Sequence, residues 1–371
     1  MIGATLFSGG GGVEALLKEH IEFVRAVEFD PQIAAVYAQN IGPHVQVADV
    51  RHVDYGTWPR LDYLHASPVC KNFSAAKTNG TESDDDMTTA AAVVRCLEAT
   101  QPRVFTLENV QAYEGSASYR LIVSWLNHNG YMWHAETLNA ANYGVPQTRR
   151  RLILRAVRDA LLPGLPPPTR WVGWYEAIED LIPGLPESAF APWQLARLPE
   201  GLTDTVLVNN GGFNGGPLDR VAADRPCFSV VSSLHSKGAM PRAFIVDGQT
   251  NDAGAVVTVP HSHNPMDTVS ASCDRRPARA WLVNGENMGR DLTIRSDREP
   301  AFVTGASAHG CARAWLHSGR VVKMTPRALA RFQSFPDSYA LPDRASLACC
   351  ILGNAAPPLL MRAVVLPLIG K

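Results

Sequence analysis

Short apolar runs alternate with longer amphipathic stretches along the first 160 residues of the chain. Apolar runs of this length are typical of buried strands, and apolar residues spaced three or four apart are typical of helices that cover a sheet. The alternation predicts an α/β fold with a mixed sheet, in which the ends of strands 61–66 and 102–107 are neighbours. The expected strands are residues 2–7, 23–28, 45–49, 61–66, 102–107, 132–138 and 151–156, and the expected helices are 31–40, 89–99 and 119–129.

Residues that could bind a ligand follow the first two expected strands. The run Ser8–Gly12 follows the first strand and precedes a helix expected to start over Val13–Lys18. Glycines at such a turn let a ligand approach backbone N–H groups, although a plain tight turn has the same composition. Glu28 and Asp30 end the second strand, about 20 residues on, where a ribose hydroxyl is held in nucleotide-binding folds. The pattern fits a nucleoside without phosphates at least as well as a dinucleotide.

A cysteine and a carboxylate follow the next two strands. Cys70 comes after strand 61–66 and opens a polar segment, 71–89, so it lies where open α/β sheets place their chemistry. A lone cysteine is more often a buried structural thiol. Glu108 and Asn109 end strand 102–107, and an acid there is equally often a helix cap. The run 84–86 of three aspartates is read as a solvated turn or a helix start rather than a metal clamp.

Three consecutive arginines close the segment 142–151. Such a run usually marks a solvated face, but Arg149 and Arg151 are expected to share one side of the following strand. Their guanidinium groups would then point together into a site that handles a polar or anionic base.

The chain changes character after the proline-rich stretch 161–168, which predicts a domain boundary. Between 206 and 316 a unit of roughly 35–40 residues recurs, with strands expected at 207–209, 245–247 and 282–284. This predicts a β-rich module, in which His261, His263 and His309 are read as surface or ligand contacts rather than metal ligands. Helical patterning returns with Thr325 as N-cap and Pro326 after it, and 353–358 is expected to open a C-terminal helix.

Composition limits the class of protein. The 371 residues are 46% hydrophobic and carry a formal charge of −1, so any nucleic-acid contact must rely on local patches. Seven cysteines without a CxxC pair favour reduced thiols and give no zinc spacing. The N-terminus lacks the features of a signal peptide, and no apolar run is expected to span a membrane. We therefore expect a soluble cytoplasmic protein.

Together these stretches resemble the DNA (cytosine-5) methyltransferase family. The motifs occur in the family's order: Phe7–Gly12, Glu28–Asp30, Asp49, Cys70, Glu108–Val110, Gln147–Arg151, Arg327–Pro336 and Gly353–Asn354. The resemblance implies a Rossmann-like S-adenosylmethionine-dependent catalytic domain at 1–165, a β-rich target-recognition domain at 166–320, and a segment at 321–371 that returns to the catalytic domain.

The resemblance also implies roles for single residues. Cys70 would add to cytosine, a protonated Glu108 would donate to the ring with Arg151 and Arg149 beside it, and Asn109 would fix nearby backbone. A flipped-out base would be covered by the loop that contains Lys71 and Ser74. The cofactor S-adenosylmethionine, with no metal, would be held by Phe7, Gly9, Gly11, Glu28, Phe29, Asp49, Val50 and Asn354.

Val69 and Lys71 depart from the Pro-Cys-Gln that the family has at its nucleophile. Lys71 places a cation beside the thiol, which favours the thiolate. The departure leaves open a catalytically silent DNA-binding relative. Methylation of transfer RNA and a nicotinamide-dependent oxidoreductase with the same glycine turn also stay open. The expected partners are double-stranded DNA and a possible restriction endonuclease counterpart, for a monomer without a membrane, associated with the nucleoid and of bacterial or phage origin.

Overall fold

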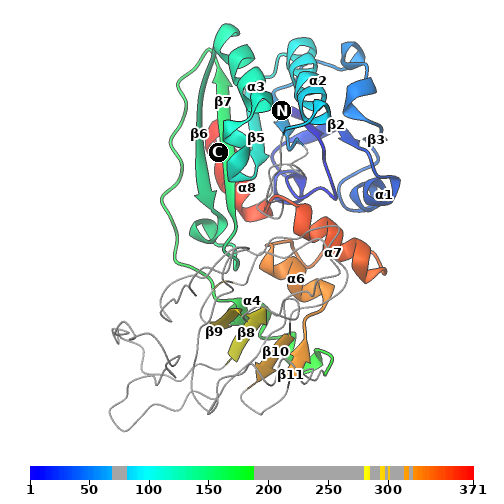
Figure 1. Ribbon diagram of the computed structural model, residues 1–371, viewed down its shortest axis with the longest axis vertical. Helices are drawn as coiled ribbons and strands as arrows, with labels where there is room; N and C mark the ends of the chain where they lie inside the picture. Colours follow the sequence, from blue (N-terminus) through cyan, green and yellow to red (C-terminus); the bar gives the residue numbers. More distant parts are fainter. Residues whose placement is uncertain (69–81, 188–279, 285–292, 297–299, 301–312, 317–320) are drawn as a thin grey trace.

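In the part of the chain that the computed structural model describes, the strands form two β-sheets, of seven and four strands (Figure 1). The structure describes residues 1–68, 82–187, 280–284, 293–296, 300, 313–316 and 321–371. The seven-stranded sheet and the helices on its two faces confirm the predicted α/β class.

The large sheet is mixed, with five parallel strands followed by an antiparallel pair. Its order is β3 (Val45–Val47), β2 (Glu22–Glu28), β1 (Ile2–Leu6), β4 (Tyr63–Ala66), β5 (Val104–Asn109), β7 (Arg150–Arg158) and β6 (Tyr131–Asn139). Strand β7 runs antiparallel to both β5 and β6. The beginning of β7 therefore lies at the same edge as the carboxyl ends of the parallel strands.

Two helices, α2 (Asp84–Thr100) and α3 (Ala117–His128), pack on one face of the sheet. Helix α2 starts five residues before the expected Thr89 because Ser83 and Asp86 form a capping box. The three aspartates 84–86 thus occupy the first turn of a helix, where their charge meets the positive end of the helix dipole. This confirms the helix-start interpretation of the acidic run.

The other face is covered by α8 (Pro358–Leu368) and the short 3-10 turn η1 (Glu14–Leu16). The helix expected from Val13 is therefore wrong; a single 3-10 turn follows the glycines. The C-terminal region holds α7 (Ala345–Asn354) before α8, so 353–358 links two helices rather than opening one. Gly353 and Asn354 end α7, and Pro358 begins α8.

The segment Ala345–Leu368 is long and apolar enough to cross a membrane by composition alone, with a mean hydropathy of 1.6. It is interrupted at residues 355–357, and 61% of its most apolar stretch is buried within the protein. Packing of α7 and α8 against the rest of the chain accounts for this apolar character.

Four helices, from three distant parts of the sequence, share a further core. Helix α4 (Trp174–Ile178) packs with α6 (Pro326–Phe332) and α7, and α1 (Pro31–Asn40) contributes Val36. Thr325 caps α6 and Pro326 is its first residue, as predicted. Short 3-10 turns complete the described elements: η2 (Val50–His52), η3 (Tyr55–Thr57), η4 (Gln111–Gly115), η5 (Ala140–Tyr143) and η6 (Ile182–Gly184).

The small sheet is antiparallel, in the order β11 (Val321–Lys323), β10 (Arg313–Leu316), β8 (Ala280–Asn284) and β9 (Thr293–Ser296). Strand β8 includes the predicted strand 282–284. The earlier repeats at 207–209 and 245–247, and the three histidines of this module, lie outside the described residues. The domain boundaries at 165 and 320 remain predictions.

Candidate active site

The glycine turn after β1 leaves one side open and closes the other against the C-terminal helices. Phe7 and Gly9 have φ of 58° and 55°, in the left-handed region. A Cβ built on Gly9 meets nothing within 4 Å, whereas one on Gly12 would lie 2.8 Å from the carbonyl oxygen of Ala356. Gly11, with φ of 87°, lies against Ile41. The turn therefore offers free space at Gly9 and is supported from behind.

Glu28 is bound to this turn. Its Oε2 accepts a 2.9 Å hydrogen bond from the backbone N–H of Gly9, and its Oε1 accepts one of 2.8 Å from Asp30. Burial raises the pKa of the Glu28 carboxyl above its ordinary value, and the two backbone donors oppose that shift. Each carboxylate oxygen keeps a second lone pair, so the group can still accept from ligand hydroxyls.

The remaining predicted cofactor residues differ in their exposure and in their hydrogen-bond partners. Phe29 is 72% exposed beside Glu28 and presents its ring to solvent. Asp49 accepts hydrogen bonds from the Arg51 backbone and guanidinium, which lower the pKa of its carboxyl. Val50 is buried at the start of η2. Asn354 is exposed at the end of α7 and donates to the Cys350 sulfur over 3.6 Å.

An adenosine-containing cofactor fits this arrangement on geometric grounds. The space beside Gly9 admits a ligand close to the backbone, Glu28 supplies acceptors for ribose hydroxyls, and the exposed Phe29 ring supplies a stacking face. The acidic end of β2 disfavours a phosphate at the same place, because like charges repel. The turn thus suits a nucleoside that carries no phosphate.

The second half of the site is built where β4 and β5 end side by side. Asn109 donates from Nδ2 to the carbonyl oxygen of Pro68 over 2.9 Å, and its Oδ1 accepts from the N–H of Val110 over 2.8 Å. Its amide therefore links the end of β5 to the backbone that leaves β4. Cys70, Lys71 and Ser74, predicted from the sequence to act here, lie outside the described residues.

Glu108 forms an ion pair with Arg151 across the β5–β7 ladder. The Nε of Arg151 lies 2.9 Å from Oε1 of Glu108, and the glutamate is 6% exposed. In the register of the two strands Glu108 faces Ile153 and Asn109 faces Leu152, which places Arg151 at the open edge. A guanidinium is thus held beside a carboxylate next to the strand end that leads to Cys70.

Arg149 contacts the C-terminal helices, and its predicted catalytic role remains a prediction. It is 2% exposed, and its Nη2 donates to the carbonyl oxygen of Gly353 over 3.1 Å. Gln147, from the same motif, donates to the carbonyl oxygen of Phe332 over 3.5 Å. Arg149 precedes β7 rather than lying within it, so strand alternation does not govern its direction. The motif therefore connects β7 to α6 and α7, and Arg151 is its member that pairs with Glu108.

A buried chain of polar side chains at the end of β4 was missed from the sequence. The Nδ1 of His65 lies 2.8 Å from Oγ1 of Thr106, and its Nε2 lies 2.8 Å from Oγ of Ser67. Tyr63 reaches the same threonine at 2.8 Å. Burial lowers the pKa of His65 to about 3, which keeps its ring neutral. The sequence did contain an indication of this chain, because Tyr63, His65 and Ser67 occupy every second position along an apolar strand and just past its end, and so lie on one face.

A second missed group is Glu14, fully buried beneath the glycine turn. Its Oε1 accepts a 2.5 Å hydrogen bond from Thr5 on β1, and it lies against Tyr37 of α1. Burial raises the pKa of the Glu14 carboxyl to about 7, although the contacts with Thr5 and Tyr37 lower it. In the sequence, the only indication of this group was that an acid directly follows Val13, at the end of the glycine turn.

Comparisons with known proteins cover most of the chain. The model of the family described as C-5 cytosine-specific DNA methylase matches residues 1–170 and 261–369. Type II methyltransferase M1.HphI of Haemophilus parahaemolyticus is 25% identical, over 97% of this chain and 84% of that protein. M.HgiCI of Herpetosiphon aurantiacus is also 25% identical, over 98% and 96%. M.HhaI of Haemophilus parahaemolyticus is 31% identical over 42% of this chain and 49% of its own.

Solved structures share the fold. Entamoeba histolytica methyltransferase EhMeth aligns over 100% of this chain and 98% of its own, with a TM-score of 0.58 and 13% identity. A Spodoptera frugiperda DNMT2 mutant aligns over 99% of each chain, with a TM-score of 0.56 and 13% identity. At this identity the likeness concerns the arrangement of helices and strands.

Proposed function

The chain belongs to the C-5 cytosine-specific DNA methylase family and is a DNA cytosine-5 methyltransferase, and on that premise we propose that it acts through a covalent adduct between Cys70 and the target base. One observation supports this most directly: Asn109 binds the backbone at Pro68, two residues before Cys70, beside the Glu108–Arg151 ion pair. In this proposal the thiol of Cys70, the carboxyl of Glu108 and the guanidinium of Arg151 all contact the same target base.

The proposed reaction begins at carbon 6 of cytosine, because carbon 5 is too weakly nucleophilic to accept a methyl group directly. The Cys70 thiolate forms a bond to carbon 6 as the double bond between carbons 5 and 6 breaks, and the displaced electron pair, shared with ring nitrogen 3, makes carbon 5 an enamine-like nucleophile. After methylation, the proton at carbon 5 leaves to a base. The carbon–sulfur bond then breaks, which restores the ring double bond and the thiolate.

Glu108 and Arg151 stabilise the charge that this addition moves onto the base. When Glu108 carries a proton, it donates to ring nitrogen 3, and Arg151 holds the carbonyl oxygen. Glu108 is nearly buried, so water competes little for either contact. Arg149 acts from a distance in this proposal, because its guanidinium binds the end of α7 and so fixes the start of β7.

S-adenosylmethionine would supply the methyl group as a sulfonium. Phe7, Gly9 and Gly11 would line its path along the turn, Glu28 would accept from its ribose, and Phe29 would cover its adenine. Asp49 and Val50 would lie at the adenine end and Asn354 at the methionine end. The open space at Gly9 and the backbone-bound Glu28 support this assignment.

The substrate follows from the reaction. Carbon 6 of cytosine is stacked inside a duplex, so the base has to be turned out of the helix, with the loop of Lys71 and Ser74 closing over it. Residues 166–320 would read the sequence as a target-recognition domain. The curated relatives carry the name Type II methyltransferase, so we propose a cytoplasmic, nucleoid-associated monomer with a restriction endonuclease counterpart.

Transfer of labelled methyl groups to duplex DNA tests the function. Wild type and Cys70→Ala would be incubated with labelled S-adenosylmethionine and mixed-sequence duplexes, and 5-methylcytosine mapped at base resolution. We expect label with wild type and none with Cys70→Ala, while Cys96→Ala, a core thiol on α2, retains transfer. Label transferred by Cys70→Ala would exclude Cys70 as the nucleophile. Label found only in transfer RNA would exclude duplex DNA as the substrate.

Equilibrium binding tests the cofactor site separately from catalysis. Glu28→Gln replaces an acceptor with a donor beside the N–H of Gly9, so we expect the dissociation constant for S-adenosylmethionine to rise about tenfold. Glu22→Gln, at the exposed start of the same strand, is the matched control. Equal affinity in both variants would remove Glu28 from the site.

A further inference from the structure

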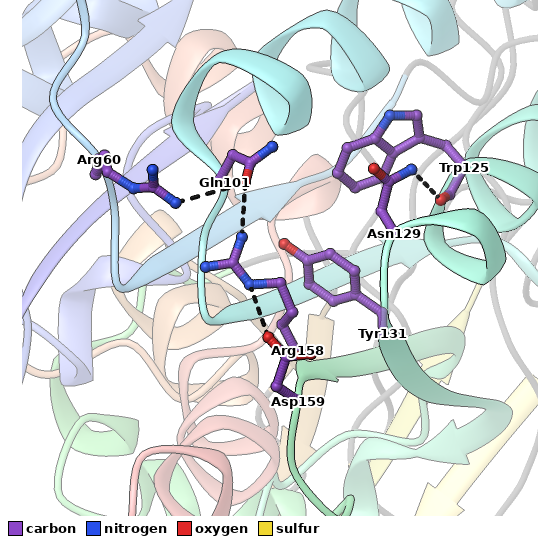
Figure 2. Close-up of a pocket in the computed structure, with 7 residues that line it drawn as sticks. All are labelled: Arg60, Gln101, Trp125, Asn129, Tyr131, Arg158 and Asp159. Carbon is purple, nitrogen blue, oxygen red and sulfur yellow. Dashed lines mark hydrogen bonds and ion pairs between the residues drawn. The ribbon is translucent and has the colours of Figure 1, made fainter.

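A cavity of about 290 Å³ lies at the edge of the large sheet opposite the active site (Figure 2). Arg60 precedes β4, Gln101 lies between α2 and β5, Tyr131 begins β6 and Arg158 ends β7. Because β7 is antiparallel, its end meets the amino ends of the parallel strands. The cavity is thus built from residues at the ends of four elements of the large sheet's amino edge and shares no residue with the glycine turn.

Two cations converge on one neutral oxygen in this cavity. Arg60 donates from Nη2 and Arg158 from Nη1 to Oε1 of Gln101, over 3.4 and 3.0 Å. Those two bonds occupy both lone pairs of the amide oxygen, whereas each guanidinium has five N–H donors. Two like charges directed at one neutral group repel each other, and an anion between them would relieve that repulsion.

The nearby carboxylate neutralises this charge only weakly. Oδ2 of Asp159 lies 3.7 Å from Nε of Arg158, beyond hydrogen-bond distance, and its side chain is 80% exposed. Among the described residues no other acidic side chain lines the cavity. Solvent screens an exposed pair of this kind, so the cavity keeps a positive potential.

The backbone around the cavity is strained. Gln101 and Asp159 have φ of 47° and 54°, and they are two of the four non-glycine residues with positive φ in the described part of the chain. A third, Phe7, lies in the glycine turn. Left-handed backbone costs a non-glycine residue on the order of 1 kcal/mol, and at Gln101 it ends α2 as the helix C-cap. Here it directs the Gln101 side chain toward both arginines, as Figure 2 shows.

Aromatic rings form another wall of the cavity. The centroids of Trp125 and Tyr131 lie 5.7 Å apart with their planes at 46°. Tyr131 is held by a 2.5 Å hydrogen bond from its hydroxyl to the carbonyl oxygen of Pro102, so its ring is fixed. Tyr131 is 7% exposed and supports the partly exposed Trp125 ring, which is the apolar surface this wall offers to a planar group next to the arginines.

We propose that this cavity is a binding site for a small phosphate monoester that carries a planar ring, such as a nucleoside monophosphate. The phosphate oxygens would accept from Arg60 and Arg158, whose forked donors match phosphate geometry. The ring would lie on Trp125, which Tyr131 holds in place. The volume is at the small end of ligand pockets, roughly 300–1,000 Å³, which suits one nucleotide.

Calorimetry with the full-length protein tests the site. AMP and inorganic phosphate would each be titrated in a phosphate-free buffer with saturating S-adenosylhomocysteine, so that AMP cannot occupy the proposed cofactor turn. We expect AMP to bind more tightly than phosphate, and Arg60→Gln and Arg158→Gln each to weaken both by about tenfold. Arg120→Gln, an exposed arginine on α3, is the matched control and should bind both normally.

A ring variant separates the two parts of the site. Trp125→Leu should weaken AMP and leave phosphate unchanged, because the ring wall contacts only the nucleoside. Arg60 is exposed, so Arg60→Gln keeps the fold even where Arg158→Gln lowers the melting temperature. No heat with AMP or phosphate in wild type, or equal affinity in wild type and both arginine variants, would overturn the proposal.

Discussion

The side-chain amide of Asn109 joins β5 to the backbone of Pro68 through a 2.9 Å hydrogen bond. The amide oxygen of the same side chain accepts from the N–H of Val110, so the nitrogen and the oxygen of one amide bind two separate stretches of backbone. Asn109 is 3% exposed, and water cannot replace these partners. Its position therefore determines the path of the chain from β4 toward Cys70.

Replacing Asn109 with alanine should cost both stability and methyl transfer. The change leaves the carbonyl of Pro68 and the N–H of Val110 without this partner, and each buried unsatisfied group costs about 1–3 kcal/mol. We expect a lower melting temperature and a fall in the rate of transfer. Asn127→Ala, which removes an exposed contact with Trp133, should change neither. An unchanged transfer rate in Asn109→Ala would contradict this role.

Loss of Arg151 should be more damaging to folding than loss of the Glu108 charge. Arg151→Gln leaves a buried carboxylate without its cation, which costs about 3–5 kcal/mol. Glu108→Gln leaves no buried negative charge, so we expect it to fold while transfer falls by about 10²–10⁴. Thermal melting and single-turnover transfer separate the two effects. Arg150→Gln, at the exposed neighbouring position, is the control. Near-normal transfer by Glu108→Gln would exclude the proposed acid.

The sheet and its functional edge were predictable because the information is local. Each parallel strand is a short apolar run, and Glu28 and Glu108 stand at strand ends in the sequence itself. Parallel strands bring such ends to one edge of a sheet. The prediction failed after the glycine turn, where helical spacing over 13–18 produced only η1, whose neighbours Val13 and Leu17 pack against α8.

Side-chain partners between distant segments were not predictable. Arg149 binds Gly353, 204 residues away, and no local spacing distinguishes that partner from a solvated face. The cavity of Arg60 and Arg158 depends on β7 being antiparallel, and the residue pattern does not say which strand of the expected mixed sheet runs in that direction. Single residues in separate loops carry no shared motif, so only the folded chain brings them together.

His65 should make the protein less stable as the pH falls through the range from 6.5 to about 3. Its pKa is lowered to about 3 by burial, so between these values the unfolded chain binds a proton that the folded chain does not. Stability should thus rise with pH there by up to about 1.4 kcal/mol per unit. Denaturant unfolding of wild type and His65→Gln measures this as a difference in slope.

The exposed His128 on α3 provides the control for that comparison. His128→Gln should leave the slope of wild type nearly unchanged, since solvent surrounds its ring in both states. His65→Gln should also slow methyl transfer, because the hydrogen bond to Ser67 helps to hold the start of the cysteine loop. Parallel unfolding profiles for wild type and His65→Gln would contradict the neutral, buried state of the ring.

Glu14 should have the opposite dependence on pH. Its pKa is raised to about 7 by burial, so between 4.5 and 7 the folded chain holds a proton that the unfolded chain has lost. The stabilisation of the folded chain by protonated Glu14 is complete below pH 4.5 and is lost as the pH rises through 7. Glu14→Gln, which cannot ionise, should match wild type at pH 4 and exceed it by about 3 kcal/mol at pH 8. The exposed Glu19→Gln should follow wild type throughout. Equal stabilities of wild type and Glu14→Gln at pH 8 would show that Glu14 ionises freely beneath the turn.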